Sequence, residues 1–242
     1  MKRFFFPLTL SFLIVFSLYS QEKAEGISSI ETENYANRVL QFYYYIPSKV
    51  LKEKDKAHPL LACIPYLSGR GEEFVLPIFK DFAEEEGFLI ISPSFVFDEK
   101  NWESRTSYQY PSAWSGEAFL RIVEKVKKEF GLNISKFYLF GFSAGAQFSL
   151  RFALWKPELC SAVSAHAGGG TVIPDRFVNV KFFVSVGRDD RGRIPIVEEF
   201  YKKAKELGID VTYRQYFGGH ILPIYQIKDS LEFFKKVRDK EK

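Results

Sequence analysis

Short apolar runs and amphipathic stretches follow one another along this chain. The apolar runs suit buried strands of a parallel sheet, which are apolar throughout because both of their faces are covered. Strands are predicted at residues 38–46, 60–64, 88–91, 137–140, 162–165, 180–186 and 211–216. Because strands alternate with helical stretches, the pattern predicts an α/β fold with a mostly parallel central sheet and helices on both faces.

The amphipathic stretches predict helices at residues 73–86, from about 146 to 155 and from about 196 to 207. One helix is marked by apolar residues at helical spacing: Phe119, Ile122, Val123, Val126 and Phe130. Ser115 is placed for an N-cap, Gly87 for a left-handed C-terminal cap and Gly131 for a helix stop. A closing helix is indicated by Ile227, Leu231 and Phe234.

Residues 1–20 have the composition of a secretory signal peptide. Lys2 and Arg3 precede an apolar run, and Ser20 stands at a plausible cleavage point. The alternative is a membrane anchor, but the run is shorter than the ~20 residues that span a bilayer. We therefore expect a secreted or periplasmic protein with no stable membrane insertion, in which residues 21–242 form one domain.

The charge of the chain gives no sign of a nucleic-acid partner. The formal charge is +4, and loss of Lys2 and Arg3 with no acidic residue would leave +2. Nucleic-acid binding requires clustered basic residues. Acidic and basic residues alternate in the run 52–56, which is therefore interpreted as a solvated loop.

Cys63 and Cys160 are predicted to be buried free thiols rather than a disulfide. Both lie in or beside apolar runs, and a free cysteine behaves as a small hydrophobe. If strands 60–64 and 162–165 flank strand 137–140, they are about 9–10 Å apart, which is too far for a disulfide. The spacing of cysteines and histidines resembles no metal site, so neither a metal nor a cofactor is expected.

The strongest functional signal is Gly141-Phe142-Ser143-Ala144-Gly145, which lies between strand 137–140 and a helical stretch. This context is that of a nucleophile elbow. The tight turn strains the central serine, and small residues two positions before and after it let the backbones pass. A chance match is the alternative, but the strand before and the helix after favour a nucleophilic Ser143.

A serine hydroxyl is a poor nucleophile until a base takes its proton. His220 follows Gly218-Gly219 directly after the last strand, where a flexible turn can bring the ring over the sheet. His58 is expected to be solvated in the charged loop, and His166 to be packed or hydrogen-bonded locally. His220 is therefore the predicted base.

The imidazole of such a base needs a carboxylate that fixes its tautomer. Asp189 and Asp190 both follow the strand that ends at Gly187. We prefer Asp190, because an acid three residues beyond the strand-ending glycine is the usual placement in this architecture. The other aspartate can pair with Arg188 or Arg191, and the choice between the two acids stays open.

With these motifs the chain resembles the α/β-hydrolase superfamily, and within it small secreted esterases of the polyhydroxybutyrate-depolymerase and feruloyl-esterase kind. The matching segments are residues 43–47, 141–145, 164–168, 187–190 and 219–220. They are spread over nearly the whole chain after residue 20. The resemblance implies a triad in the chain order Ser143, Asp190, His220.

The chain departs from these relatives after strand 60–64. Relatives often carry there a His-Gly pair that helps to form the oxyanion hole, whereas this chain has Pro65-Tyr66-Leu67-Ser68-Gly69. The resemblance implies the main-chain N–H of Ala144 as one oxyanion donor and that of Tyr66 or Leu67 as the second.

An aromatic-rich segment, residues 95–114, is expected at the edge of the sheet where substrates bind. Its Trp102, Tyr110 and Trp114 are predicted to line a recess for an apolar or aromatic group. The alternative is that its rings form a small core under the loop. No Lys-Ser/Thr pair follows Gly168-Gly169-Gly170, which is therefore interpreted as a flexible loop rather than a phosphate site.

These observations together predict a secreted serine hydrolase that cleaves a small-molecule or polymeric carboxylic ester through an acyl-enzyme on Ser143. Two other functions stay open. The chain could be a serine peptidase of the same fold, or a non-catalytic binding protein that keeps the hydrolase scaffold. A monomer is the default expectation for its assembly.

Overall fold

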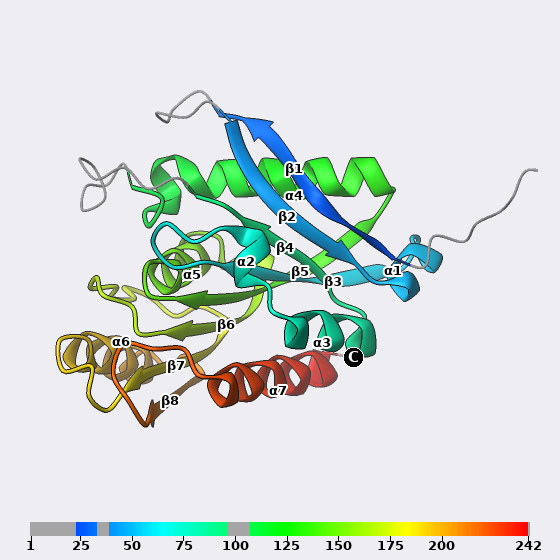
Figure 1. Ribbon diagram of the computed structural model, residues 1–242. Helices are drawn as coiled ribbons and strands as arrows, with labels where there is room; N and C mark the ends of the chain where they lie inside the picture. The colour runs from blue at the N-terminus through cyan, green and yellow to red at the C-terminus, as the bar shows by residue number, and fades with distance from the viewer. Residues whose placement is uncertain (1–22, 33–38, 96–106, 242) are drawn as a thin grey trace, which may run out of the picture.

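The computed structural model describes residues 23–32, 39–95 and 107–241, and its sheet lies between two layers of helices (Figure 1). The strands are β1 (Ala24–Glu31), β2 (Val39–Ile46), β3 (Ala57–Ile64), β4 (Leu89–Pro93), β5 (Asn133–Phe142), β6 (Cys160–His166), β7 (Lys181–Gly187) and β8 (Val211–Tyr216). The α-helices are α1 (Ser48–Lys52), α2 (Gly71–Phe74), α3 (Pro77–Glu86), α4 (Gly116–Phe130), α5 (Ala144–Trp155), α6 (Ile194–Glu206) and α7 (Ile224–Glu241). Two short helical turns complete the elements, η1 (Pro111–Ser115) and η2 (Pro157–Leu159). The predicted signal peptide, residues 1–20, lies outside the described residues.

The sheet confirms the predicted mostly parallel arrangement. Its strand order is β1-β2-β4-β3-β5-β6-β7-β8, with β1 and β2 antiparallel to their neighbours and the other pairs parallel. Strands β3 and β6 flank β5, so Cys63 and Cys160 lie on strands that do not pair with each other. Both cysteines are buried free thiols, as expected.

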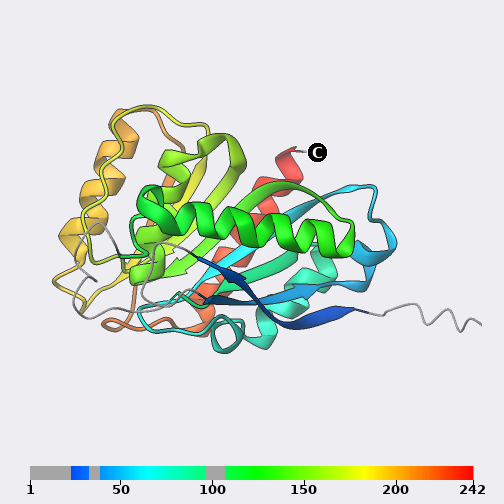
Figure 2. The same ribbon diagram turned by 90° about the horizontal axis from the view of Figure 1, so that it is seen from above.

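Helices cover both faces of the sheet, as predicted. On one face α4, α5 and α6 contribute Phe119, Phe148 and Phe200 to the larger apolar core. On the other face α2 and α7 contribute Phe74 and Phe234 to a second core, and α3 packs against α7 (Figure 1, Figure 2). Because both faces are covered, the central strands are apolar on both sides, which explains why the sequence shows them as continuous runs.

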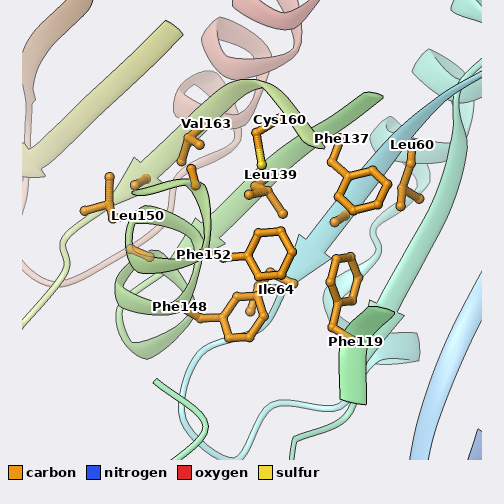
Figure 3. Packing of buried hydrophobic residues seen from close by; sticks show 14 of the residues in the cluster. Leu60, Ile64, Phe119, Phe137, Leu139, Phe148, Leu150, Phe152, Cys160 and Val163 are labelled. Atoms are coloured by element: carbon orange, nitrogen blue, oxygen red, sulfur yellow. The ribbon is translucent and has the colours of Figure 1, made fainter. Parts of the chain in front are cut away.

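Aromatic rings hold the central strand and its following helix together (Figure 3). The ring of Phe119 meets Phe137 edge-on at 5.8 Å between centroids and Phe152 at 5.5 Å. Such edge-to-face pairs contribute roughly 0.5–1.5 kcal/mol each beyond the burial of their area. This packing fixes β5 and α5, the two elements that flank Ser143.

The prediction of a single helix over residues 73–86 is wrong, because the chain forms two helices there. Helix α2 ends at Phe74, and α3 begins at Pro77. Leu76 has the extended conformation, with φ −68° and ψ 161°. The residue before a proline is driven out of the helical region, whereas proline itself suits the first helical turn. The predicted end was correct, since Gly87 caps α3 with φ 73°.

Two further expectations near the N-terminus are corrected by the structure. No strand was predicted before residue 38, yet the chain forms an edge strand there, β1, in which only Ala24 is buried. An edge strand with one partner lacks the apolar run by which we recognised the others. His58 is not solvated, because it lies buried in β3 with its Nε2 atom 2.7 Å from the carbonyl oxygen of Glu53.

The predicted helix boundaries around residues 115–131 are partly confirmed. Gly131 ends α4 in the left-handed conformation, with φ 66°. Ser115 precedes α4 but has helical dihedral angles and does not cap it. Its hydroxyl instead donates to the carbonyl oxygen of Tyr108 at 2.7 Å. The π-helical turn η1 leads directly into α4, so the N-cap prediction is wrong.

Helix α7 returns the chain to the amino-terminal ends of the parallel strands. The carboxylate of Glu241 accepts a hydrogen bond from Ser161 at 2.9 Å, near the start of β6, and one from Tyr138 at 2.7 Å, in the middle of β5. Among the residues that the structure describes, no helix combines the length and apolar character needed to cross a membrane.

Candidate active site

Ser143 occupies a sharp bend between β5 and α5. Its φ is 56° and its ψ is −115°, a strained conformation for a residue with a side chain. A Cβ on Gly145 would lie 2.1 Å from the carbonyl oxygen of Ile64, and one on Gly141 would lie 2.4 Å from that of Gly145. Only glycine fits at these close approaches, which explains the spacing around Ser143. The Ser143 N–H donates to the carbonyl oxygen of His166 at 2.8 Å.

His220 reaches Ser143 from the loop after β8. Its Nε2 atom lies 3.0 Å from the Ser143 hydroxyl oxygen, and its ring stacks on Phe142 at 4.8 Å between centroids. The end of β7 supports this loop, because the N–H of Asp189 donates to Gly218 at 3.0 Å. A Cβ on Gly187 would lie 2.2 Å from the carbonyl oxygen of Gly219, so the two backbones touch. The imidazole is therefore held in place by its stacking on Phe142 and by the contact of its loop with the end of β7.

The structure brings Asp190, and not Asp189, to His220. The Oδ2 atom of Asp190 lies 2.8 Å from Nδ1 of His220, and Asp190 is 7% exposed whereas Asp189 is exposed. A carboxylate at Nδ1 holds the proton on that nitrogen and leaves Nε2 as the acceptor that faces Ser143. The arrangement can therefore move a proton from the serine hydroxyl to the imidazole.

Arg193 holds the second carboxylate oxygen of Asp190. Its Nη1 atom lies 3.2 Å from Oδ1. The main chain adds to this support, because the N–H groups of Arg193 and Ile194 both donate to the carbonyl oxygen of Asp190, at 2.9 and 3.1 Å. A charge-assisted hydrogen bond to Oδ1 fixes the carboxylate without competing for Oδ2. Hydrogen bonds to both carboxylate oxygens, from His220 and from Arg193, thus fix the orientation of Asp190.

His166 lies behind Ser143 but takes no part in this arrangement. Its Nδ1 atom is 2.6 Å from the hydroxyl of Ser185, and its Nε2 atom is 2.9 Å from those of Ser164 and Ser230. Burial lowers the pKa of His166 to about 3, so the ring is neutral at physiological pH. The expectation that it is hydrogen-bonded locally is confirmed.

Of the predicted oxyanion donors, Ala144 and Leu67 line the cleft together with Ser143. Ala144 is the first residue of α5, where a helix leaves its N–H groups without intrahelical acceptors. Residues 66–69 form a tight turn after β3, closed by the N–H of Gly69, which donates to Tyr66 at 2.8 Å. Leu67 borders the cleft next to Ser143, whereas Tyr66 is 46% exposed and its ring meets Phe142 edge-on.

A cleft of about 360 Å³ opens beside the nucleophile. It is lined by Leu67, Gln109, Tyr110, Ser143, Ala144, Gln147, Gly169, Gly170 and Arg193. Of the predicted aromatic wall, Tyr110 lines the cleft. Trp114 is instead buried in the larger core, edge-on to Phe95 at 5.9 Å. Its assignment to the recess is therefore corrected, because the ring packs in the larger core. Trp102 lies outside the described residues.

Sequence reasoning did not find several residues of this cleft. Gln109, Gln147 and Arg193 are polar residues in or beside helices, where the sequence offers no distinction from ordinary surface positions. The position of Gln147, one helical turn after Ser143, is the signal that could have indicated it. Gly169 and Gly170 were interpreted only as a flexible loop, yet they form one wall.

Within the described part of the chain, no group of three or more histidine, cysteine, aspartate or glutamate side chains could hold a metal ion. The chemistry that the site can perform with its own groups is nucleophilic attack by a hydroxyl, assisted by a histidine and oriented by a carboxylate.

Comparison with curated proteins finds acetylxylan esterases. The chain is 25% identical over 130 residues to a probable acetylxylan esterase A of Aspergillus clavatus, a match that covers 52% of this chain and 41% of that protein. It is 22% identical over 130 residues to acetylxylan esterase A of Emericella nidulans, with the same shares of 52% and 41%. The chain thus spans less than half the length of these relatives, and no family model matches it.

Comparison with solved structures finds similar folds over most of the chain. A ferulic acid esterase superposes with a TM-score of 0.69 and 14% identity, over 89% of this chain and 98% of that one. The fluorophosphonate-binding serine hydrolase FphF of Staphylococcus aureus gives 0.67 and 12%, over 89% and 98%. A poly(3-hydroxybutyrate) depolymerase from Bordetella parapertussis gives 0.63 and 16%, over 88% and 90%. The chain therefore has the α/β-hydrolase fold.

Proposed function

We propose that this chain, on its α/β-hydrolase fold, is a serine carboxylic-ester hydrolase that acts through an acyl-enzyme on Ser143. The observation that carries the proposal is the continuous series of contacts from the Ser143 hydroxyl through His220 to Asp190, at 3.0 and 2.8 Å, beside an open cleft. The names of the similar proteins, acetylxylan esterase and ferulic acid esterase among them, support ester hydrolysis.

Acylation begins when the Ser143 oxygen attacks the carbonyl carbon of the ester. Nε2 of His220 accepts the hydroxyl proton, and the Asp190 carboxylate stabilises the resulting imidazolium. The tetrahedral intermediate collapses as His220 returns the proton to the leaving alcohol oxygen. The products of this half-reaction are the free alcohol and an acyl group bound to Ser143.

The negative oxygen of the intermediate is stabilised by main-chain donors. The Ala144 N–H lies at the positive end of the α5 dipole, which favours an anion. The turn of residues 66–69 supplies the second donor, from the N–H of Tyr66 or Leu67. Removal of one such donor typically lowers the rate by about 10²–10³-fold, so these amides contribute substantially to catalysis.

Deacylation repeats the same steps with water in place of the alcohol. His220 takes a proton from the water, whose oxygen attacks the acyl carbon, and then returns it to the Ser143 oxygen. The free acid leaves and the hydroxyl is restored. Every proton in this cycle is carried by His220, and no cofactor is required.

The proposed substrate is a small-molecule or polymeric ester, and the protein is proposed to act outside the cytoplasm. The open cleft and the similarity to esterases support the first statement, and the composition of residues 1–20 supports the second. N-terminal sequencing of the protein from the growth medium or periplasm of an expressing cell tests export, and a mature N-terminus at Gln21 is expected.

The function is tested by labelling and turnover. A fluorophosphonate probe is expected to modify Ser143 in the wild type and to leave Ser143→Ala unlabelled, as peptide mass spectrometry can report. Hydrolysis of 4-nitrophenyl acetate is expected in the wild type and lost in Ser143→Ala, while Ser112→Ala, at an exposed serine of η1, serves as the control. Full turnover by Ser143→Ala would refute the proposal.

The two alternative functions give different results in the same assay. A peptidase would hydrolyse the matched 4-nitroanilide as well as the ester, whereas an esterase is expected to prefer the ester. A binding protein that keeps only the scaffold would leave Ser143 unlabelled.

A further inference from the structure

Gln147 is a polar residue of the cleft that the proposed mechanism does not use. It lies on α5 one turn after Ser143, and its N–H donates to the carbonyl oxygen of Ser143 at 3.3 Å. The residue is buried at 7% exposure and forms part of the cleft wall. A glutamine amide has an acceptor end and a donor end, so its function depends on which end faces the cleft.

Arg151 determines the orientation of this amide. Its Nη1 atom lies 3.2 Å from Oε1 of Gln147 and 3.0 Å from the carbonyl oxygen of Gln109. A guanidinium has donors only, so the end of the amide that faces it must be the carbonyl oxygen. The amino group of Gln147 is therefore at the opposite end of the amide.

Arg151 is itself held firmly in place. Its Nη2 atom lies 3.3 Å from the carbonyl oxygen of Thr171, and its guanidinium covers the ring of Tyr110 at 4.1 Å from the centroid. Gly170 leaves room for the pair, because a Cβ there would lie 2.1 Å from Oε1 of Gln147. These contacts come from three separate segments, so Gln147 cannot exchange its two amide ends without losing a partner.

The described lining of the cleft offers hydrogen-bond donors and no carboxylate. No acceptor is recorded for Nε2 of Gln147 among the residues that the structure describes. Arg193 also borders the cleft, where its Nη1 atom pairs with Asp190, and the described lining residues include no aspartate or glutamate. A ligand in this cleft therefore meets hydrogen-bond donors, and an oxygen on that ligand can accept a hydrogen bond where an alkyl chain cannot.

We propose that Gln147, positioned by Arg151, is a specificity-determining residue whose Nε2–H donates to an acceptor oxygen of the substrate beside the scissile ester. The enzyme then prefers esters with an ether, hydroxyl or carbonyl oxygen near the reacting carbonyl over esters whose chain is alkyl at the same place. This inference rests on the proposed ester hydrolysis and adds the class of ester.

Two pairs of esters that differ by one oxygen test the preference. On the alcohol side, 2-methoxyethyl acetate is compared with butyl acetate. On the acyl side, 4-nitrophenyl methoxyacetate is compared with 4-nitrophenyl butanoate. The measured quantity is the ratio of kcat/KM within each pair, which is divided by the same ratio for Gln147→Met to cancel the intrinsic reactivity of the esters. One donated hydrogen bond is expected to change this quotient about 3- to 10-fold in at least one pair.

Gln147→Glu separates the donor from the shape of the side chain. Glutamate keeps an oxygen for Arg151 but has no amide donor, so it is expected to lose the preference as Gln147→Met does. Gln41→Glu, at an exposed position of β2, makes the same chemical change away from the cleft and should leave both ratios at the wild-type value. Thermal unfolding of each variant reports whether it is folded.

Arg151 is tested as a positioning residue by the same ratios. Arg151→Lys keeps a cation and donors for Gln147, and it is expected to retain more of the preference than Arg151→Met. A purely structural role for Arg151 would lower stability and turnover on both members of each pair equally, leaving the ratios unchanged.

Equal ratios in the wild type, Gln147→Met and Gln147→Glu for both pairs would overturn this inference. If these ratios are the same in the variants and the wild type still hydrolyses all four esters, ester hydrolysis stands and only the role of Gln147 is refuted. If the wild type hydrolyses none of them and Ser143 resists the fluorophosphonate probe, both proposals fail.

Discussion

At the scale of single residues, the acid of the site illustrates what a sequence can and cannot decide. Asp189 and Asp190 are chemically identical and adjacent, so the sequence offered only a preference for the second. The structure separates them by burial, because Asp190 is enclosed between His220 and Arg193 while Asp189 is exposed. The elbow around Ser143 was easier to predict, because its glycines follow from backbone contacts that no other residue permits.

Asp190→Asn tests the role of this carboxylate. The amide cannot hold the Nδ1 proton as a carboxylate does, so the wrong tautomer of His220 faces Ser143. We expect kcat on 4-nitrophenyl acetate to fall by about 10³-fold or more, with an unchanged fold by circular dichroism. Asp189→Asn is the matched control and should keep a rate close to the wild type; an equal loss in both variants would count against the assignment.

At the scale of secondary-structure elements, most of the parallel sheet and most of its helices could be predicted from the sequence. Strands β4, β6 and β7 and the second half of β5 are buried on both faces, which makes most of their residues apolar or small. The edge strand β1 has one partner strand and little burial, so its pattern is weak. The break between α2 and α3 was missed because the composition on both sides of Pro77 suits a helix.

The contact between the ends of β7 and β8 gives a prediction at this scale. A methyl group at Gly187 would lie 2.2–2.3 Å from the carbonyl oxygens of Gly219 and Gly218. Gly187→Ala must therefore displace the loop that carries His220, and a shift of about 1 Å can lower the rate ~100-fold. We expect a fall of that order in kcat/KM on 4-nitrophenyl acetate.

Gly192→Ala is the matched control for that measurement. No atom lies within 4 Å of a Cβ built at Gly192, which is only five residues further along the chain. Its turnover should equal that of the wild type. Wild-type kcat/KM in Gly187→Ala would show that the loop of His220 does not depend on this close approach.

At the scale of the whole molecule, a polar cluster joins the sheet to α7. Gln226 donates to the Ser185 hydroxyl at 2.6 Å, and the Ser230 hydroxyl donates to the Gln226 carbonyl oxygen at 2.7 Å. Ser185 and Ser230 also contact the His166 ring, so Gln226, the two serines and the neutral imidazole form one connected hydrogen-bond network. Protonation of the ring would reverse the hydrogen bond between Nδ1 and the Ser185 hydroxyl, because Nδ1 would have to donate where it now accepts.

This cluster predicts a dependence of stability on pH. The pKa of His166 is lowered from 6.5 to about 3 by burial, so below pH 6.5 the unfolded chain binds a proton that the folded chain excludes. The contribution of this group is complete above pH 6.5 and is lost progressively between pH 6.5 and 3. The free energy of unfolding should fall by about 1.4 kcal/mol per pH unit in this window from His166 alone.

Urea unfolding between pH 7.0 and 5.0 measures this slope. The lowered carboxylate pKa values of Glu25 and Glu86 start from 4.5 and contribute mainly at lower pH, so they interfere little in that range. His166→Gln is expected to be less stable at pH 7 and to show a shallower slope. An identical slope in the variant would mean that another group is responsible.

The path of α7 also has a practical consequence for handling the protein. Its first turn follows the loop of His220, whereas Glu241 in its last turn accepts a hydrogen bond from Ser161 near the start of β6. The last turn of α7 therefore lies at the amino-terminal edge of the sheet, whereas the cleft lies at its carboxyl-terminal edge. An affinity tag or a linker to a solid support joined there would leave the mouth of the cleft open, even to a bulky polymer.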